Sequence, residues 1–133
     1  MARFMIATLT MAALLGAAIV SNGARGDVWA LAALLGITVG VFALDKLAAL
    51  AAPDKPGEAF PAGDGLAVAL GLLHFPLLYG GVWGVAGGGG HDATARVALF
   101  FALGLFLGQV GNSNAHELIH RPDRRLRRLG IAV

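Results

Sequence analysis

The sequence predicts an all-α protein, a polytopic membrane bundle of about four transmembrane helices. Composition points first to this class, because hydrophobic residues make up 57% of the 133 residues and charged residues only 14%. The mean hydropathy of +0.74 is too high for an ordinary soluble domain of this length. Four apolar segments also approach the roughly 20 residues that cross a bilayer as a helix. We therefore expect a single transmembrane domain that occupies residues 1–133.

The first two predicted helices, at about 4–20 and 28–50, form a hairpin. Between them lies SNGARGD (21–27), a composition typical of a tight turn. A signal peptide is the alternative for the first segment, but its small-residue cleavage pattern is poor. Near the end of the second helix, Asp45 and Lys46 either form a paired anchor at the membrane interface, which we favour, or face the bundle interior.

The third and fourth predicted helices, at about 65–86 and 97–120, are separated by the run GGGG at 87–90. Glycine runs of this kind mark helix ends. His74 lies in the middle of the third helix, where a neutral, hydrogen-bonded packing role is favoured over metal ligation. His91 follows the glycines, and we expect it to be a solvated loop residue.

Two pairs of glycines in these helices have the small-xxx-small spacing of close helix packing: Gly80 with Gly84, and Gly104 with Gly108. Such pairs either bring helices of one molecule together or form a dimer interface. We favour packing within the molecule for both pairs.

Basic residues predict the orientation in the membrane, because Lys and Arg are enriched in cytoplasmic loops. In a four-helix topology one side carries only Arg25 and Arg96. The other side carries eight basic residues: Arg3, Lys46, Lys55, Arg121, Arg124, Arg125, Arg127 and Arg128. Both termini are therefore expected in the cytoplasm, in an inner-membrane protein. The pI of about 9.7 reflects this asymmetry and is no argument for nucleic-acid binding.

Polar residues gather at the end of the fourth predicted helix, in the run QVGNSNAHELIHR (109–121). His116 and His120 are i,i+4 neighbours on a helix, so both imidazoles project from one face and can bind a metal, with Glu117 beside them. The chain has no cysteine, so any metal must use His, Asp or Glu. Pro122 predicts that the helix ends or kinks at His120–Arg121, before a short basic amphipathic segment that we expect to lie along the membrane.

Two interpretations fit this spacing equally well. The string H-E-x-x-H is that of zinc metalloproteases, in which the glutamate is the general base. Histidine clusters at the cytoplasmic ends of helices can equally hold iron in a membrane oxygenase, since imidazole suits both metals.

The flanking residues favour the oxygenase. The string NSNAHELIHRPDRRLRRLG resembles the first histidine box of the integral-membrane alkane hydroxylases (alkane 1-monooxygenases), in the fatty acid desaturase-like superfamily. The residues that fit its pattern are Asn112 or Asn114, His116, Glu117, Leu118, His120, Arg121, Leu129 and Gly130. A weaker resemblance covers the rest of the chain, with Leu44–Asp45 in the second helix and HFPLLYG (74–80) in the third. The order is similar to the N-terminal part of these enzymes, which have a larger, six-helix-type fold.

The resemblance implies a non-haem di-iron monooxygenase that uses O2 to hydroxylate the terminal methyl group of alkanes or related alkyl chains. Electrons would come from a rubredoxin or a ferredoxin. His116 and His120 would be iron ligands, and Glu117 would orient one of the imidazoles.

The chain departs from this family in its ligand count, because it has four histidines in all and two ligands cannot hold two irons. We therefore expect the N-terminal part of a larger enzyme, incomplete at its C-terminus and inactive alone. A zinc metalloprotease fragment and a non-catalytic membrane protein are the alternatives.

Overall fold

The computed structural model describes residues 2–40, 42 and 64–133, and this part of the chain is all-α, without strands. Its elements are α1 (Ala2–Val20), α2 (Gly23–Leu35), a π-turn (Gly36–Gly40), α4 (Asp64–Val85), a 3₁₀ turn (Gly88–Gly90), α5 (Ala93–Phe106), a second π-turn (Leu107–Gly111), α6 (Asn112–Ile119) and α7 (Arg124–Ala132). Of the predicted helix 28–50, residues 41 and 43–50 lie outside the described residues, and with them the predicted anchor Asp45–Lys46 and the Leu44–Asp45 pair.

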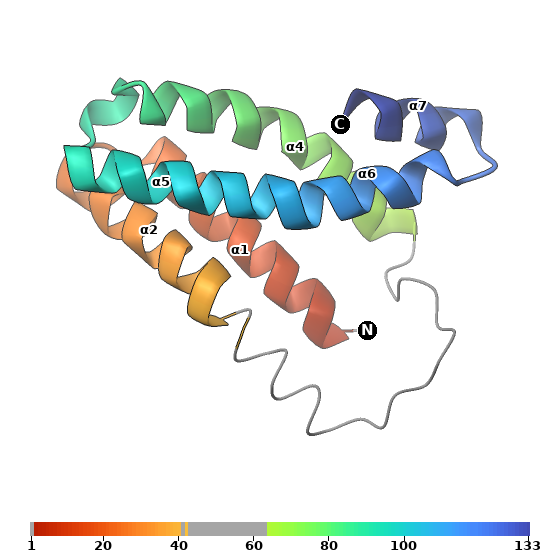
Figure 1. The fold of residues 1–133 in the computed structure, drawn as a ribbon, viewed down its shortest axis with the longest axis horizontal. Helices are drawn as coiled ribbons and strands as arrows, with labels where there is room; N and C mark the ends of the chain where they lie inside the picture. The colour runs from red at the N-terminus through yellow and green to blue at the C-terminus, as the bar shows by residue number, and fades with distance from the viewer. Residues whose placement is uncertain (1, 41, 43–63) are drawn as a thin grey trace.

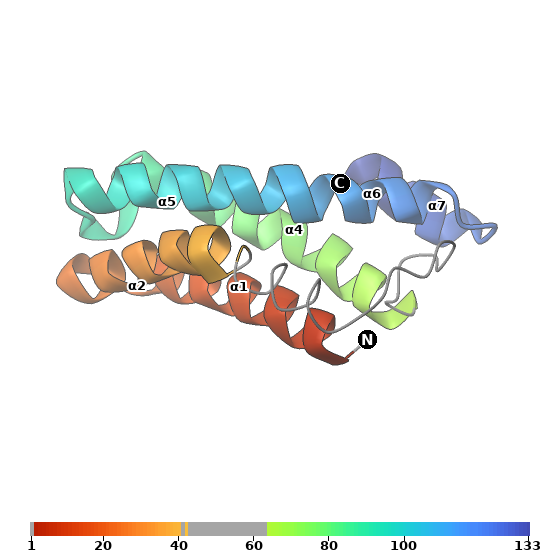
Figure 2. The ribbon, with the colours of Figure 1, turned by 60° about the horizontal axis from the view of Figure 1, so that its bottom comes forward.

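The helices form two antiparallel hairpins that lie side by side, α1 with α2 and α4 with α5 (Figures 1 and 2). The N-terminus, the start of α4 and the junction of α6 with α7 share one end of the bundle, which we call the motif end. The short connections 21–22 and 86–92 share the opposite end, called the turn end. This up-and-down order is the one expected for four predicted helices.

Two helices are long and apolar enough to cross a membrane. One is Gly65–Val85, with 21 residues, and the other is the rod Ala93–Ile119, with 27 residues. The apolar stretch of α1, Ile6–Val20, is shorter. The described residues therefore support two of the four predicted spans by length and composition.

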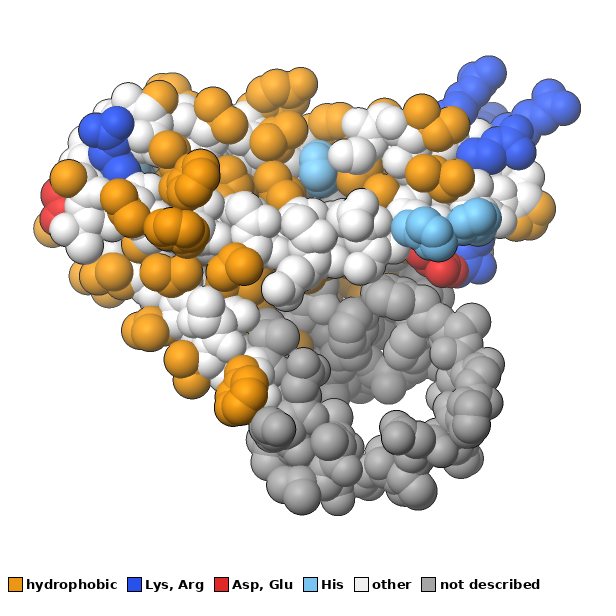
Figure 3. All heavy atoms as spheres, in the orientation of Figure 1, with side chains coloured by type: hydrophobic (Ala, Val, Ile, Leu, Met, Phe, Trp, Pro, Cys, Tyr) orange, Lys and Arg blue, Asp and Glu red, His pale blue; other side chains and the backbone are white. Residues whose placement is uncertain are grey.

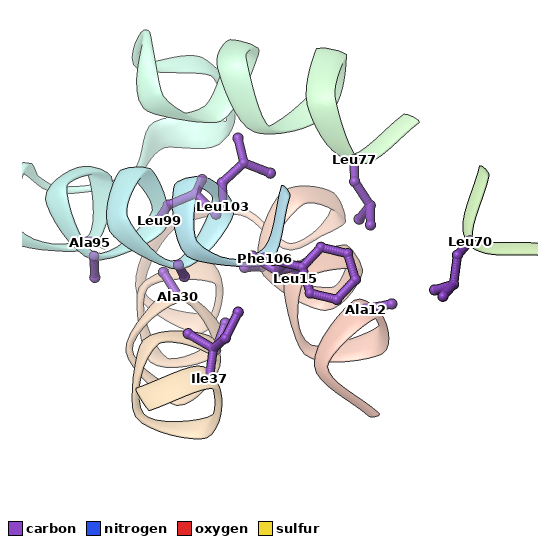
Figure 4. Close-up of a cluster of buried hydrophobic side chains, with 14 of the residues drawn as sticks. Ala12, Leu15, Ala30, Ile37, Leu70, Leu77, Ala95, Leu99, Leu103 and Phe106 are labelled. Atoms are coloured by element: carbon purple, nitrogen blue, oxygen red, sulfur yellow. The ribbon is translucent and has the colours of Figure 1, made fainter. Parts of the chain in front are cut away.

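The core between the hairpins is built from small and aliphatic side chains. Leu15, Leu99 and Ala102 are almost completely buried, and Figure 4 shows Phe106 of α5 directed toward α1, where Leu15 lies. Close approach depends on glycine, because a Cβ at Gly80 would lie 2.6 Å from Ile19 Cγ2. The hairpins are therefore in contact at van der Waals distance along much of their length.

Gly80 and Gly84 pack within the molecule, as predicted, since a Cβ at Gly84 would lie 2.8 Å from Leu99 Cδ2. The prediction is wrong for the other pair. Gly104 and Gly108 are exposed, and a Cβ at either position would meet nothing within 4 Å in the described structure. This second glycine pair, with Gly104 in α5 and Gly108 in the following π-turn, faces outward.

Two helices begin earlier than predicted. α2 starts at Gly23 rather than residue 28, because Gly23 adopts a positive φ of 55° and compresses the turn to Ser21–Asn22. α5 starts at Ala93 rather than residue 97, because the carboxylate of Asp92 accepts a hydrogen bond from the Ala95 amide (2.7 Å) and caps the helix. The ends of α1 and α4 agree with the prediction within two residues.

Candidate metal centre

The rod that carries the histidines is interrupted by the π-turn Leu107–Gly111. Buried positions in α5 follow the usual spacing of three or four residues as far as Phe106, and the next buried position is Gly111, five residues later. Asn114 and Leu118 then continue the buried face. The wider turn adds one residue, so α6 keeps the same face toward α4 that α5 does. The opposite face, which carries His116 and His120, points outward.

His116 and His120 lie together on the exposed side of α6 at the motif end (Figure 3). Their ring centroids are 4.6 Å apart and the ring planes meet at 62°. Two neighbouring imidazoles of this kind can approach one metal ion from the same side. The predicted pairing on one helical face is confirmed, whereas ligation itself stays a prediction.

Glu117 is half-buried beside the pair and contacts a cation rather than an imidazole. Its Oε1 lies 2.7 Å from Nη2 of Arg121, one turn later. Helix α6 ends at Ile119, with His120 as the C-cap residue, so the predicted end before Pro122 is confirmed. Arg121, the first residue after the C-cap, therefore holds the Glu117 carboxylate next to the histidines.

Asn112 and Asn114, both candidates for the asparagine of the histidine box, lie on opposite sides of α6. Asn112 is exposed, while Asn114 is 1% exposed and donates through Nδ2 to the carbonyl oxygen of Ala67 on α4 (2.9 Å). Oδ1 of Asn114 has no hydrogen-bond partner among the described residues. Asn114 thus attaches the histidine-bearing helix to its neighbour, a role that its sequence position alone did not distinguish.

The basic segment forms the predicted amphipathic helix, α7, and this helix folds back against α6 and α4. A Cβ at Gly130 would lie 2.8 Å from the Ala115 carbonyl oxygen and the Ile119 nitrogen, and Leu129 contacts Gly71 of α4. Its arginines form the opposite, exposed face and make no ion pair with a described residue: Arg124, Arg125, Arg127 and Arg128. α7 therefore supports the back of α6, opposite the histidines.

His74 lies apart from the histidine pair. Its ring packs edge-on against Phe75 (centroids 5.8 Å apart), and its Nδ1 faces Gly111, where a Cβ would lie 3.2 Å away. The expected packing position is confirmed, but Nδ1 has no hydrogen-bond partner in the described structure. His74 therefore lies where α4 packs against the π-turn Leu107–Gly111.

The prediction for His91 is wrong. Its side chain is fully buried at the turn end, and its Nδ1 lies 3.1 Å from Oδ1 of Asp27 on α2. Glycines make the space, since a Cβ at Gly26 would lie 2.5 Å from Cε1 of the ring. The same Asp27 oxygen accepts a hydrogen bond from the Asp92 amide (3.3 Å). His91 therefore links the two hairpins. In the sequence, only the neighbouring glycines indicated close packing at this position.

An apolar groove of about 390 Å³ runs between α1 and α4. The residues that line it are Leu9, Ala12, Ala13, Gly16, Ile19, Val20, Leu73, Pro76 and Leu77. No histidine belongs to this lining. The groove has the polarity that suits an alkyl chain, and it lies on a different part of the molecule from the histidine pair.

No group of three or more His, Cys, Asp or Glu side chains able to hold a metal occurs within residues 2–40, 42 and 64–133. His116 and His120 suit a metal as two of its ligands, because imidazole is a ligand for both zinc and iron. The remaining ligands would have to come from other residues. Comparison of the chain with protein-family models, curated proteins and solved structures found no match.

Proposed function

We propose that this chain is the N-terminal part of a membrane non-haem di-iron monooxygenase of the alkane hydroxylase type. His116 and His120 would hold iron, with the other ligands supplied by residues outside these two. The reaction would hydroxylate the terminal methyl group of an alkane or a related alkyl chain with O2 and with electrons from a rubredoxin or a ferredoxin. The chain alone would be inactive.

The observation that carries the proposal is the exposed imidazole pair, with ring centroids 4.6 Å apart, at the end of a rod of membrane-spanning length. Iron bound there would supply oxygen activation. The chain's own residues contribute placement, because Asn114 fixes α6 on α4 and the π-turn sets the outward direction of both rings. Glu117, paired with Arg121, would offer a carboxylate to an imidazole N–H.

The apolar groove supports an alkyl-chain substrate, since hydrocarbon would reach it directly from the bilayer. The topology that we propose has four transmembrane helices in the inner membrane, with both termini and the motif end in the cytoplasm. The exposed arginines of α7 support this orientation, because a cluster of cations is retained on the cytoplasmic side.

Metal analysis tests the proposal. The complete gene product, with any polypeptide encoded directly downstream, is purified, loaded with Fe(II) without oxygen or with Zn(II), and compared with a His116→Ala/His120→Ala variant. The matched control is Arg124→Ala/Arg128→Ala, which removes another exposed i,i+4 pair at the same end. We expect iron in the parent and in the control, and its loss in the histidine variant.

Each other result contradicts the proposal. One tightly held zinc that displaces iron would indicate the zinc metalloprotease, in which Glu117 acts as general base. Equal metal contents in the parent and the histidine variant would show that His116 and His120 bind no metal. This result would indicate a non-catalytic membrane protein.

A further inference from the structure

The outward face of the α5–α6 rod is polar where it should meet lipid. Gln109, Asn112 and Ser113, which we call the polar row, are all exposed. Phe106 is the midpoint of the span Ala93–Ile119, so at about 1.5 Å per residue Gln109 lies about 5 Å and Ser113 about 10 Å from the bilayer centre. Both depths are inside the apolar half-thickness of about 15 Å.

The polar row leaves its hydrogen-bonding groups without partners. None of the three side chains bonds to another described residue. Thr38, an exposed polar residue of the α2 hairpin, behaves differently, because its hydroxyl donates to the Leu34 carbonyl oxygen at 2.6 Å. Unsatisfied amides facing lipid are costly, and polar residues in a span therefore face protein or a wet cavity.

We propose that a second copy of this chain packs against this face, across the polar row and the open glycines Gly104 and Gly108. Amide and hydroxyl groups both donate and accept, so the row complements itself and carries no charge that would repel a second copy. Among the described residues, nothing lies within 4 Å of a Cβ built at either glycine, which lets the two rods approach closely. Figure 3 shows this uncharged stretch of α5 and α6 continuing to the histidines.

The symmetry of such a dimer places equal residues at equal depth, because both copies insert in the same direction and the two-fold axis lies along the bilayer normal. His116 follows the polar row along the same face, and His120 lies one turn after His116. Two imidazole pairs would then lie at the motif end of one dimer, each pair supplying two ligands to the iron site of the proposed function. This last step rests on the proposed iron site, whereas the interface rests only on the proposed membrane topology.

Disulfide trapping tests the interface, because the chain has no cysteine of its own. Ser113→Cys and Gln109→Cys are placed in the full chain in phosphatidylcholine vesicles and oxidised with copper phenanthroline. The controls are Leu72→Cys on α4 and Leu35→Cys on α2, which are 59% and 61% exposed. We expect covalent dimers at the polar row to form about tenfold faster than at the controls, because of their higher effective concentration.

A second variant tests the hydrogen bonds themselves. Gln109→Leu/Asn112→Leu is added to Ser113→Cys, and Thr38→Leu in the same background is the matched control. We expect the double leucine variant to cross-link at the rate of Leu72→Cys, and the Thr38→Leu variant to cross-link at the full rate. Equal rates at position 113 and at the controls, or trapping of a different protein in place of a second copy, would overturn the proposal.

Iron content separates this inference from the proposed function. If the complete gene product, with any polypeptide encoded directly downstream, cross-links at the polar row but holds no iron, the interface stands and the monooxygenase is contradicted. Iron bound by a chain that does not cross-link at the polar row leaves the monooxygenase standing and contradicts the interface.

Discussion

The side chain of His91 connects the two hairpins through one carboxylate. The imidazole is fully buried and Asp27 is 20% exposed. Nδ1 lies 3.1 Å from Oδ1 of Asp27 and donates to it, because a carboxylate oxygen accepts. The same oxygen also accepts from the Asp92 amide. A single carboxylate therefore holds both the ring and the backbone that starts α5.

We predict that Asp27→Ala destabilises the protein, because it leaves the buried imidazole N–H without an acceptor. A buried group that loses its partner costs about 1–3 kcal/mol. The free energy of unfolding is measured by titration with sodium dodecyl sulfate in mixed micelles. Asp92→Asn, which keeps an N-cap side chain, is the control and should change stability far less. Equal losses in the two variants would contradict a special role for Asp27.

Asn114 has a comparable role at the motif end. We predict that Asn114→Ala lowers the free energy of unfolding by about 1–3 kcal/mol, because its buried hydrogen bond to the Ala67 carbonyl is lost. Asn22→Ala is the control, since Asn22 is exposed and its side chain makes no capping bond to α2. If both variants unfold alike in thermal denaturation followed by circular dichroism, the bond contributes little.

At the scale of elements, the π-turn adds one residue to the α5–α6 rod without changing which face is buried. Deletion of Val110 from this turn should therefore give an ordinary α-helix in which Asn114 and Leu118 still face inward. Deletion of Ala115, which lies in a regular turn, should instead rotate the histidine pair by about 100°.

We predict a melting temperature near that of the parent for the Val110 deletion and a much lower one for the Ala115 deletion. Both are measured by circular dichroism at 222 nm in detergent. The opposite order would show that the π-turn itself, rather than the register that it maintains, is needed for folding.

α7 depends on Gly130 for its position. A side chain there would meet the backbone of α6 at Ala115 and Ile119, so we predict that Gly130→Ala loosens α7 and lets trypsin reach the peptide bonds after its exposed arginines. Cleavage should become about tenfold faster, because local opening controls proteolysis. Gly16→Ala is the control, because a Cβ there meets nothing within 4 Å. Unchanged cleavage would mean that α7 tolerates the shift.

The sequence predicted α1 and α4 well because each is one long apolar segment bounded by polar residues or glycine. The starts of α2 and α5 were predicted too late, because they depend on local features. α2 starts at the positive φ of Gly23, and α5 starts at the Asp92 cap. The π-turn could not be predicted, since nothing in LGQVG (107–111) distinguishes a π-helical turn from an α-helical one. Burial of His91 depends on Asp27, 64 residues earlier, and no local pattern contains such a contact.

At the scale of the molecule, the candidate site was predicted in part. Helical spacing placed His116 and His120 side by side, as the structure does. The same spacing could not separate Asn112 from Asn114, because the π-turn changes the register just before them. Which asparagine faces α4 is a property of packing between helices and not of either residue.

The up-and-down order of the bundle leads to a prediction about sidedness. In sealed cells, Ala24→Cys at the turn end should react with a membrane-impermeant maleimide, while Arg128→Cys at the motif end should react only after permeabilisation. The cysteine-free parent is the control for background labelling. Reversed labelling would place the histidines outside and contradict the proposed cytoplasmic site.

The two short connections at the turn end also bear on how the protein is made. In the four-helix topology that we propose, Ser21–Asn22 is too short to let α1 and α2 enter a bilayer one after the other, so the translocation machinery would insert them together. Near each connection one cation accompanies one carboxylate, Arg25 with Asp27 and Arg96 with Asp92. Each hairpin tip would then cross with no net formal charge, against little opposition from the membrane potential.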